Sequence, residues 1–378
     1  MYARLLLPPQ GKSFFLFGPR GTGKSTWVKS HYCNALTLDL LNQRLFQDLH
    51  KDPGLFGQLI ENSHAPVVVI DEVQKMPELL NEVQRFIVEK KTCFILTGSS
   101  ARKLREKGVN LLAGRARTLH LFPLTSVELG NDLNLSKSLR FGHLPEALTC
   151  DDPVDYLKSY IGTYLREEVL QEARIKNLTT FSRFLEAATF SQASILNVQS
   201  IASDCGVDRK TAESYFQLLE DFLIGVRIPI FQRKPKRKLI SHSKFYYFDV
   251  GVYQTLKRKG PLDLPEEAEG IALESLVFQE IRATLSYLKL DHELTYWRTT
   301  SGLEVDFVIY GEKIFIAIEV KRSDQIRGND LKGLQAFLED YPIAKGLVFY
   351  GGSYHLKIGK IEVIPIDQAL KKLPELFR

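Results

Sequence analysis

Residues 18–25 read Gly-Pro-Arg-Gly-Thr-Gly-Lys-Ser and fit the pattern G-x-x-x-x-G-K-[ST] without a mismatch. The preceding run Ser13–Gly18 (SFFLFG) is apolar and strand-like, and a helical pattern begins at Ser25. A strand, a glycine-rich loop and a helix in this order form a P-loop, in which backbone N–H groups surround a phosphate. The stretch therefore predicts an α/β domain that binds a nucleoside triphosphate.

Each position of this loop has a predicted task. Lys24 is expected to neutralise the β- and γ-phosphates, and the Ser25 hydroxyl is expected to bind Mg²⁺. The helix that begins at Ser25 adds the positive end of its dipole. The residues expected to contact ATP here are Gly18, Pro19, Arg20, Gly21, Thr22, Gly23, Lys24, Ser25 and Thr26.

A second apolar strand ends in two acids. Val67–Asp71 (VVVID) is followed by Glu72, so we expect Asp71 beside Mg²⁺ and Glu72 as the base for the attacking water. The alternative is a strand that merely ends in an acidic turn. A third strand, Thr92–Thr97, ends in Thr97-Gly-Ser-Ser, and Thr97 or Ser99 is expected near the γ-phosphate to orient the water unless this is a plain turn. Arg115 follows, either as a finger on a neighbouring subunit's nucleotide, which would imply a homo-oligomer, or as a surface cation.

The rest of the chain divides into two further parts. We expect a doubly wound parallel sheet in an ATPase domain over residues 1–150, a helical segment over 151–260, and a third unit over 261–378. Helices are predicted at Asp155–Ala173, Leu178–Phe190, Val198–Cys205 and Asp208–Phe222, followed by strand-like runs at Gly225–Phe231 and Lys244–Phe248. The last three of these helices, followed by the two strands as a wing, have the order of a winged helix-turn-helix.

This middle part is locally basic. Between Val226 and Gly260 there are ten Lys or Arg residues and one acid, Asp249. DNA is the predicted partner, through phosphate contacts from the candidate recognition helix and wing. The alternative is a solvated charged loop. The residues concerned are Arg209, Lys210, Arg233, Lys234, Lys236, Arg237 and Lys238.

Composition sets further limits. The chain has 378 residues, 44% hydrophobic and 25% charged, with a net charge of +5. The four cysteines form no CxxC pair, which predicts a reducing, cytoplasmic compartment and no zinc site. The N-terminus lacks the apolar run of a signal peptide, and no stretch approaches the roughly 20 apolar residues that span a bilayer, so no membrane association is expected.

Several blocks together resemble one family. They include the P-loop, the Asp-Glu strand end, Leu112-Ala-Gly-Arg115, Gly142-His-Leu-Pro-Glu146 and Phe248-Asp-Val-Gly251. The chain is similar to bacterial and archaeal AAA (AAA+-type) ATPases that carry an uncharacterised C-terminal domain of restriction-endonuclease-like fold. The likeness covers nearly the whole chain and implies that architecture more strongly than a biological process.

The C-terminal acids fit that resemblance. In the alternating run from Glu304 to Ile309, Glu304 and Asp306 share a face, and Glu319 and Lys321 share a face on the next strand. An acid followed by Glu-x-Lys is the arrangement of PD-(D/E)xK nucleases, in which carboxylates bind Mg²⁺ and the lysine holds the water. Glu274 matches the helical acid of such sites. The predicted metal ligands are Glu274, Asp306 and Glu319, and the alternative is solvated strand ends.

Three functions remain open from sequence. The first is an ATP-hydrolysing, DNA-associated protein with a nuclease-like domain. The second is a nucleotide-switched regulatory protein whose C-terminal domain is an inert docking module. The third, a small-molecule P-loop kinase, is disfavoured by the Asp-Glu strand end and the two further domains.

Overall fold

The computed structural model describes residues 2–100, 112–168, 177–233, 237, 242–258, 260 and 264–378, without the side chains of Ala113 and residues 166–168. Contacts divide the chain into two compact units. The N-terminal unit comprises Arg4–Phe122 and Asp221–Leu223, and the C-terminal unit comprises Met1–Ala3, Pro123–Glu220 and Ile224–Arg378. The finer division at residues 150 and 260 stays a prediction.

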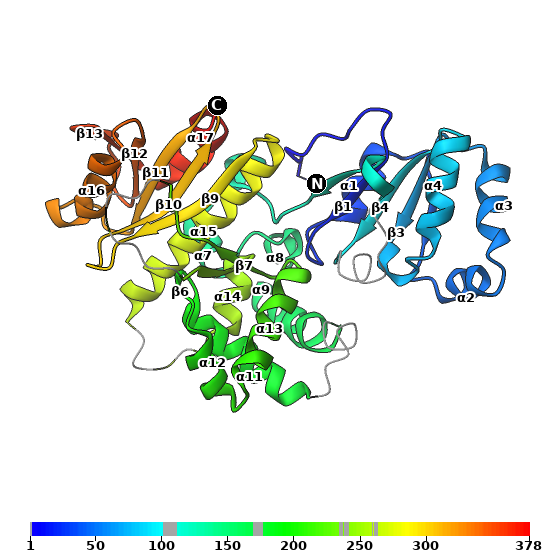
Figure 1. The fold of residues 1–378 in the computed structure, drawn as a ribbon, viewed down its shortest axis with the longest axis horizontal. Coiled ribbons are helices and arrows are strands. Elements are labelled where there is room, and N and C mark those ends of the chain that lie inside the picture. The colour runs from blue at the N-terminus through cyan, green and yellow to red at the C-terminus, as the bar shows by residue number, and fades with distance from the viewer. Residues whose placement is uncertain are drawn as a thin grey trace. The chain divides into compact units, whose positions relative to one another are not determined.

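In the N-terminal unit, the described residues form a five-stranded parallel sheet with flanking helices (Figure 1). Its elements are β1 (Phe14–Phe17), α1 (Lys24–His31), β2 (Leu36–Asp39), α2 (Gln43–Lys51), α3 (Gly54–Ser63), β3 (Val67–Asp71), η1 (Val73–Lys75), α4 (Leu79–Glu89), β4 (Cys93–Gly98), η2 (Leu112–Gly114) and β5 (Arg117–His120). Parallel strands joined by helices are the predicted doubly wound arrangement, and they define a P-loop NTPase-type α/β fold.

The order of strands in this sheet is β2-β3-β4-β1-β5. β4 therefore lies between β1, which leads into the P-loop, and β3, which ends at Asp71, as the sequence predicted for the strand that ends near Thr97. All residues of β1 are buried, and so are most residues of β3 and β4, because helices cover the sheet. The carboxyl ends of these three strands thus meet at one edge of the sheet.

The first part of the C-terminal unit is mainly helical. It contains α6 (Ser126–Leu129), η3 (Gly130–Asp132), α7 (Leu135–Phe141), α8 (Pro145–Thr149), α9 (Pro153–Ser159), η4 (Tyr160–Glu168), α11 (Leu178–Ala188), η5 (Thr189–Ser191), α12 (Val198–Cys205), α13 (Arg209–Asp221) and α14 (Val250–Leu256). Asparagine side chains cap three of these helices, with Asn134 before α7, Asn177 before α11 and Asn197 before α12.

Within the same unit, β6 (Ser194–Ile195), β7 (Gly225–Ile228) and β8 (Lys244–Tyr247) form a small antiparallel sheet in the order β6-β8-β7. The helices α11, α12 and α13 and the strands β7 and β8 follow the predicted order. The sequence did not predict β6, which has only two residues and is too short to show an alternating pattern.

One helix prediction needs correction. The predicted helix Asp155–Ala173 is α-helical only to Ser159, and a π-helical segment, η4, follows to Glu168. The rest of the prediction lies outside the described residues. An apolar pattern that repeats every three to four residues does not distinguish an α-helix from this wider winding.

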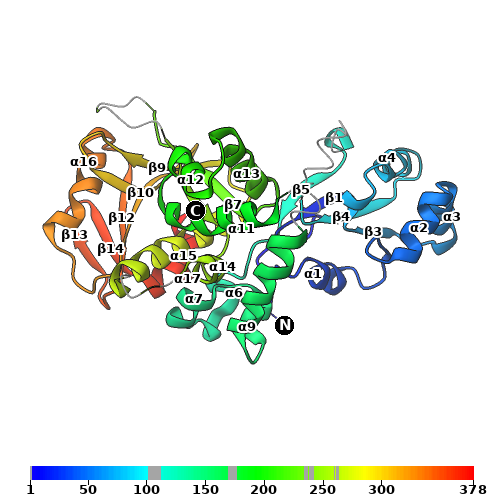
Figure 2. The same ribbon diagram turned by 90° about the horizontal axis from the view of Figure 1, so that it is seen from below.

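The last part of the chain forms a six-stranded mixed sheet in the order β13-β14-β12-β11-β10-β9. Its elements are α15 (Pro265–Tyr287), β9 (His292–Arg298), β10 (Glu304–Gly311), β11 (Phe315–Lys321), η6 (Gly328–Leu331), α16 (Lys332–Asp340), β12 (Lys345–Tyr350), β13 (Leu356–Ile358), β14 (Ile361–Pro365) and α17 (Ile366–Leu376). The helix α15 contacts both β8 and β11, and it lies with α17 on the side of the sheet away from α16 (Figure 2).

Two sequence blocks of the resemblance meet inside this unit. Asp249 accepts hydrogen bonds from the backbone N–H groups of His143 (2.8 Å) and Gly251 (2.9 Å), so it caps α14 and holds the chain after α7. A Cβ on Gly251 would lie 2.1 Å from the carbonyl oxygen of Phe141. Close backbone packing therefore requires a glycine at position 251. The two sequence blocks occur together because they contact each other in the fold.

Candidate functional site

The P-loop joins β1 to α1, and its lysine is held within the loop. Lys24 is buried, and its Nζ donates hydrogen bonds to the carbonyl oxygens of Gly18 (2.8 Å) and Pro19 (3.1 Å). The Thr22 hydroxyl also donates to Pro19 (2.9 Å). Burial lowers the pKa of Lys24, and the carboxylates of Glu72 and Asp71 oppose that shift. The loop thus holds a cation beside its own backbone.

The two motifs meet through side chains. Ser25 Oγ donates to Asp71 Oδ2 (3.0 Å), and the hydroxyl of Thr97 donates to the other carboxylate oxygen of Asp71. Thr97 Oγ1 also accepts the backbone N–H of Glu72 (3.2 Å). The predicted residues after β1 and at the ends of β3 and β4 therefore come together at one edge of the sheet, and Thr97 holds the acid pair in place.

Glu72 has an unusual backbone. Its φ of 58° lies in the left-handed region, where a non-glycine residue is strained unless its surroundings hold it. Its carboxylate accepts a hydrogen bond from the Gln74 amide, and Ser99 Oγ lies 3.4 Å from the same oxygen. Gln74 Nε2 also donates to Ser99 (3.1 Å). The side chain is therefore held by two buried polar groups. Sequence reasoning named Ser99 beside Thr97 as a group that could orient the water, but it did not select Gln74.

The N-terminal segment contributes another missed residue. Arg4 donates to the carbonyl oxygens of Thr22 (2.9 Å) and Phe122 (2.6 Å), so it links the P-loop to the chain after β5. The Trp27 indole of α1 donates to Leu6 (3.3 Å). No local motif surrounds Arg4, and its partners lie 18 and 118 positions away. The only sequence feature that could have indicated this role is an arginine ahead of the P-loop strand.

The remaining nucleotide-site predictions lie in or near the loop. Gly21 and Gly23 have φ values of 81° and 89°, which only glycine adopts without strain. Pro19, Arg20, Gly21 and Thr26 lie where the motif places them, between β1 and the first turn of α1. Arg115 is exposed, and its backbone N–H closes a turn onto Leu112 (2.8 Å) just before β5. Its role as a finger stays a prediction.

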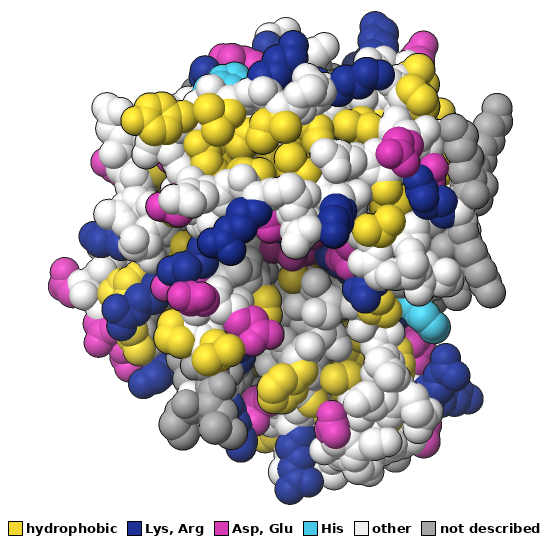
Figure 3. Space-filling view, turned by 90° about the vertical axis from the view of Figure 1, so that its left-hand side faces the viewer, with side chains coloured by type: hydrophobic (Ala, Val, Ile, Leu, Met, Phe, Trp, Pro, Cys, Tyr) yellow, Lys and Arg dark blue, Asp and Glu magenta, His cyan; other side chains and the backbone are white. Residues whose placement is uncertain are grey.

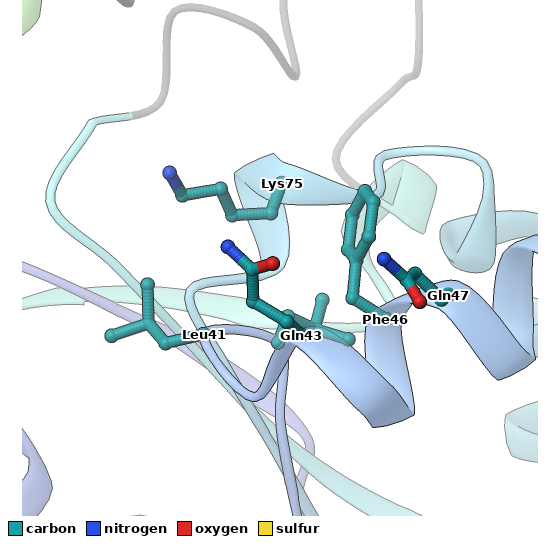
Figure 4. A pocket seen from close by; sticks show the side chains of 6 residues that line it. Leu41, Gln43, Phe46, Gln47 and Lys75 are labelled. Carbon is teal, nitrogen blue, oxygen red and sulfur yellow. The ribbon is translucent and has the colours of Figure 1, made fainter.

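A pocket of about 400 Å³ lies beyond the ends of β2 and β3, which β4 separates from the P-loop strand β1 (Figure 4). It is lined by residues that follow β2, by the start of α2 and by Lys75 of η1. Figure 4 shows Gln43 and Lys75 on facing sides of it. Because η1 directly follows Glu72, the pocket adjoins the acid strand and not the phosphate loop.

A second group of predicted residues meets in the C-terminal unit. The antiparallel pairing of β10 and β11 includes Phe307 with Ile318, which makes Asp306 and Glu319 neighbours in the register. Asp306 accepts the backbone N–H of Val320 (2.8 Å), and Lys321 donates to Glu319 (2.7 Å). Glu274 on α15 joins them through an intermediary, because Lys244 of β8 contacts both Glu274 (3.1 Å) and Asp306 (3.7 Å).

We call Glu274, Glu304, Asp306, Glu319, Lys244 and Lys321 the acid cluster. Sequence reasoning missed Lys244, which also pairs with Glu304, and Tyr246, whose hydroxyl donates to Glu274 (2.6 Å). The sequence feature that could have indicated Lys244 is a lysine in an otherwise aromatic strand, Lys244–Tyr247 (KFYY). Figure 3 shows Asp and Glu side chains in a hollow on this unit, with Lys and Arg at its border.

Burial changes the ionisation of the acid cluster. It raises the pKa of Glu274 to about 7, with the Asp306 carboxylate adding to the shift. Burial also raises the pKa of Asp306, and burial and Asp306 raise the pKa of Glu319 well above its usual value. Although burial alone would lower it, the pKa of Lys244 lies above its usual value, because Glu274, Asp306 and Glu304 surround it. Each charge here therefore depends on its neighbours.

The predicted metal role of Glu274, Asp306 and Glu319 stays a prediction. In the described parts of the chain, no group of three or more Asp, Glu, His or Cys side chains is arranged to hold a metal ion. Glu319 Oε2 is buried without a hydrogen-bond partner in that same part. Lys244 and Lys321 accompany the acids, so their arrangement differs from a set of carboxylates alone.

The predicted DNA-binding residues fall into three groups. Arg209 and Lys210 are exposed in the first turn of α13. Arg233 pairs with Glu293 (3.0 Å), and Arg237 pairs with Glu339 (2.8 Å) and Asp340 (3.1 Å). Lys234, Lys236 and Lys238 lie outside the described residues. The two described arginines are thus already neutralised by acids of the C-terminal sheet domain, whereas the α13 pair faces solvent.

Comparisons with known proteins agree with the N-terminal site. Residues 10–130 match the family model described as an AAA domain, residues 133–263 match a domain of unknown function (DUF8612), and residues 269–369 match another (DUF4143). With its P-loop and parallel sheet, the N-terminal unit is an AAA-type nucleotide-binding domain. Nothing in these matches assigns an activity to the two later segments.

Two individual proteins are also similar. An uncharacterized protein of Haemophilus influenzae is 20% identical over 290 residues, which cover 72% of this chain and 71% of that protein. A solved structure of the replication initiator DnaA bound to AMPPCP and single-stranded DNA has 12% identity and covers 56% of this chain and 82% of that one. Its TM-score of 0.28 is too low to establish a shared fold. None of the described helices is both long and apolar enough for a bilayer.

Proposed function

We propose that this protein hydrolyses ATP with Mg²⁺ at the edge of the N-terminal sheet. The observation that carries the proposal is the contact of Ser25 Oγ with Asp71 Oδ2 (3.0 Å), because it brings the P-loop hydroxyl to the acid strand. A hydroxyl and a carboxylate are oxygen ligands of the kind that Mg²⁺ prefers. The residues present therefore fit the ion, which would neutralise phosphate charge when bound.

The chain's own residues would divide the remaining work. The loop N–H groups and Lys24 would bind the phosphates, and Lys24 would exchange its bonds to Gly18 and Pro19 for phosphate oxygens. Glu72 would accept a proton from the attacking water. Thr97 would position Asp71 and Glu72 through its contacts with both.

We further propose that α11–α13 with β6–β8 is a winged helix that contacts DNA. Support comes from the helix order, from the strand order β6-β8-β7 and from the exposed Arg209 and Lys210 at the start of α13. Phosphate contacts by these two cations would give a salt-dependent affinity without sequence preference. Arg233 and Arg237 contribute less in this proposal, since both are paired with acids.

The test is phosphate release from Mg-ATP by the full chain, with and without single- and double-stranded DNA. The proposal expects stimulation by DNA, and it expects Arg209→Ala with Lys210→Ala to reduce both stimulation and duplex affinity about tenfold at low salt. The exposed lysine pair of α17, Lys371→Ala with Lys372→Ala, is the matched control. If DNA does not change the rate of ATP hydrolysis and the protein does not bind a duplex, the proposed DNA contact is contradicted, whereas the proposed ATP hydrolysis is not.

One observation favours a second candidate for the C-terminal part. Its order of α15, β9–β11, α16 and β12 supports the proposed restriction-endonuclease-like fold, yet Lys244 lies among the acids. A domain of this kind would serve as a docking module while the ATPase acts as a nucleotide-dependent switch. Tight ATP binding with negligible, DNA-independent turnover would support this candidate over the first.

A further inference from the structure

The ammonium group of Lys244 lies at the centre of the acid cluster. Its Nζ contacts Glu274 of α15 (3.1 Å), Asp306 of β10 (3.7 Å) and Glu304 at the start of the same strand. The side chain is 2% exposed, and Nζ also lies 5.5 Å from the ring centroid of Tyr296. Three carboxylates from two separate elements thus converge on one buried cation.

The other acids of the cluster have cations as well. Arg298 pairs with the second carboxylate oxygen of Glu304 (2.7 Å), and Lys321 pairs with Glu319 (2.7 Å). A divalent ion held by Glu274, Glu304 and Asp306 would therefore lie beside an ammonium group. Like charges at such distances repel strongly where burial keeps water out. The residues as arranged do not fit a divalent metal together with Lys244.

We propose that Lys244 is the resident cation of the acid cluster and excludes divalent metal ions from it. Lys244 belongs to β8 of the small three-stranded sheet, whereas its acid partners belong to α15 and β10. The ion pairs consequently join the wing strand to the C-terminal sheet. Metal-dependent phosphodiester cleavage at this cluster is not part of the function while β8 holds this position.

The geometry of β8 supports a specific role for this lysine. Tyr246, two residues along the same strand, donates to Glu274 (2.6 Å), so β8 presents a cation and a hydroxyl to the same carboxylate. The Tyr246 ring stacks on Phe278 of α15 at 4.2 Å between centroids. The strand is thus fixed against α15 by apolar contact, and Lys244 has little freedom to leave the acids.

The experiment measures Mn²⁺ binding to the full-length protein without nucleotide, from the loss of the free-ion electron paramagnetic resonance signal. Asp71→Asn is present in every protein, so that the acid of the N-terminal site does not contribute. With Lys244 intact we expect no Mn²⁺ site that depends on Asp306. Lys244→Met should create one, with at least tenfold tighter binding, and adding Asp306→Asn should remove it. Lys345→Met, on β12 of the six-stranded sheet that also contains Asp306, should gain nothing.

Two results would overturn the proposal. One is that the protein with Lys244 intact binds one equivalent of Mn²⁺ and that Asp306→Asn abolishes this binding. This comparison leaves residue 244 unchanged, so it decides the question even if Lys244→Met fails to fold. The other is a Lys244→Met protein with an unchanged circular dichroism spectrum that binds no more Mn²⁺ than its parent. The assay uses no ATP, so a failure of the proposed ATPase would leave its outcome unaffected.

Discussion

Ser25 Oγ lies 3.0 Å from Asp71 Oδ2, although 46 positions separate the two residues in the chain. The contact exists because β1 and β3 end at the same edge of a parallel sheet, with β4 between them. The hydroxyl that the P-loop provides and the carboxylate that the acid strand provides are thereby aligned. This relationship is the basis of the proposed Mg-ATP site.

Replacing Glu72 by glutamine removes the proposed base while preserving its shape. ATP binding should stay within a few-fold of the parent, and turnover should fall by about 10²-fold or more, because general base catalysis contributes on that scale. Equilibrium binding of a fluorescent ATP analogue and steady-state phosphate release give the two numbers. Glu89→Gln, exposed on α4, is the control. Near-normal turnover in Glu72→Gln would assign the base elsewhere.

Thr97→Val keeps the volume of the side chain and deletes the hydroxyl that holds both acids. The N–H of Glu72 and one oxygen of Asp71 would lose a partner, which costs about 1–3 kcal/mol for buried groups. We expect a lower free energy of unfolding, measured in urea, and about tenfold slower turnover. Thr118→Val on β5, the edge strand of the same sheet, is exposed and should change neither. If both variants behave alike, Thr97 has no positioning role.

Gly251→Ala tests the close packing of α14 on the chain after α7. The added methyl group would lie 2.1 Å from the carbonyl oxygen of Phe141, so the backbone must move, at a cost of about 3 kcal/mol. Gly270→Ala in α15 meets nothing within 4 Å and should stabilise the helix by up to about 1 kcal/mol. Urea unfolding of both variants measures the difference. Equal stability would show that the two blocks do not pack as described.

Part of the site could be read from the sequence because its signals are local. The eight residues of the P-loop follow a recognisable strand, and Asp71 ends another, so each motif can be identified from its neighbouring residues. The contact between the two motifs then follows from the order of strands in the sheet. Arg4, Gln74 and Lys244 could not be found that way. The partners of Arg4 and Lys244 are 18 to 118 positions away, and Gln74 contacts the side chain of Glu72, a residue whose positive φ no sequence pattern indicated.

The elements of the fold also differ in whether a local sequence pattern could predict them. The helix α13 and the strand β8 were predicted within two residues of their observed ends. The strands β5, β6, β13 and β14 and the helix α17 were not predicted. The shortest of them have too few residues to show a period, and the residues of β13 are all exposed, so hydrophobic alternation is absent. Their pairing depends on the strands beside them.

Glu274 should make stability depend on pH. Its pKa is about 7 in the folded protein and near 4.5 when unfolded, so between these values the unfolded chain has lost the proton that the folded chain keeps. The free energy of unfolding should therefore fall as pH rises through this window, by at most about 1.4 kcal/mol per pH unit. Urea titrations from pH 4.5 to 8 measure it. Relative to wild type, Glu274→Gln should reduce this slope, and the raised pKa values of Asp306 and Glu319 account for what remains. Glu375→Gln, exposed on α17, should keep the full slope; an unchanged slope in Glu274→Gln would assign it to other groups.

The central claim is that the P-loop hydrolyses Mg-ATP, and Lys24→Ala tests it most directly. Lys24 is buried against the loop carbonyls, whereas Lys29 is exposed on the same helix α1 and provides the matched control. The measurement is phosphate release from ATP and Mg²⁺ by the wild type, Lys24→Ala and Lys29→Ala. We predict turnover by the wild type and Lys29→Ala, and a loss of about 10²-fold or more in Lys24→Ala. Turnover that survives Lys24→Ala in a folded, homogeneous protein would contradict the account.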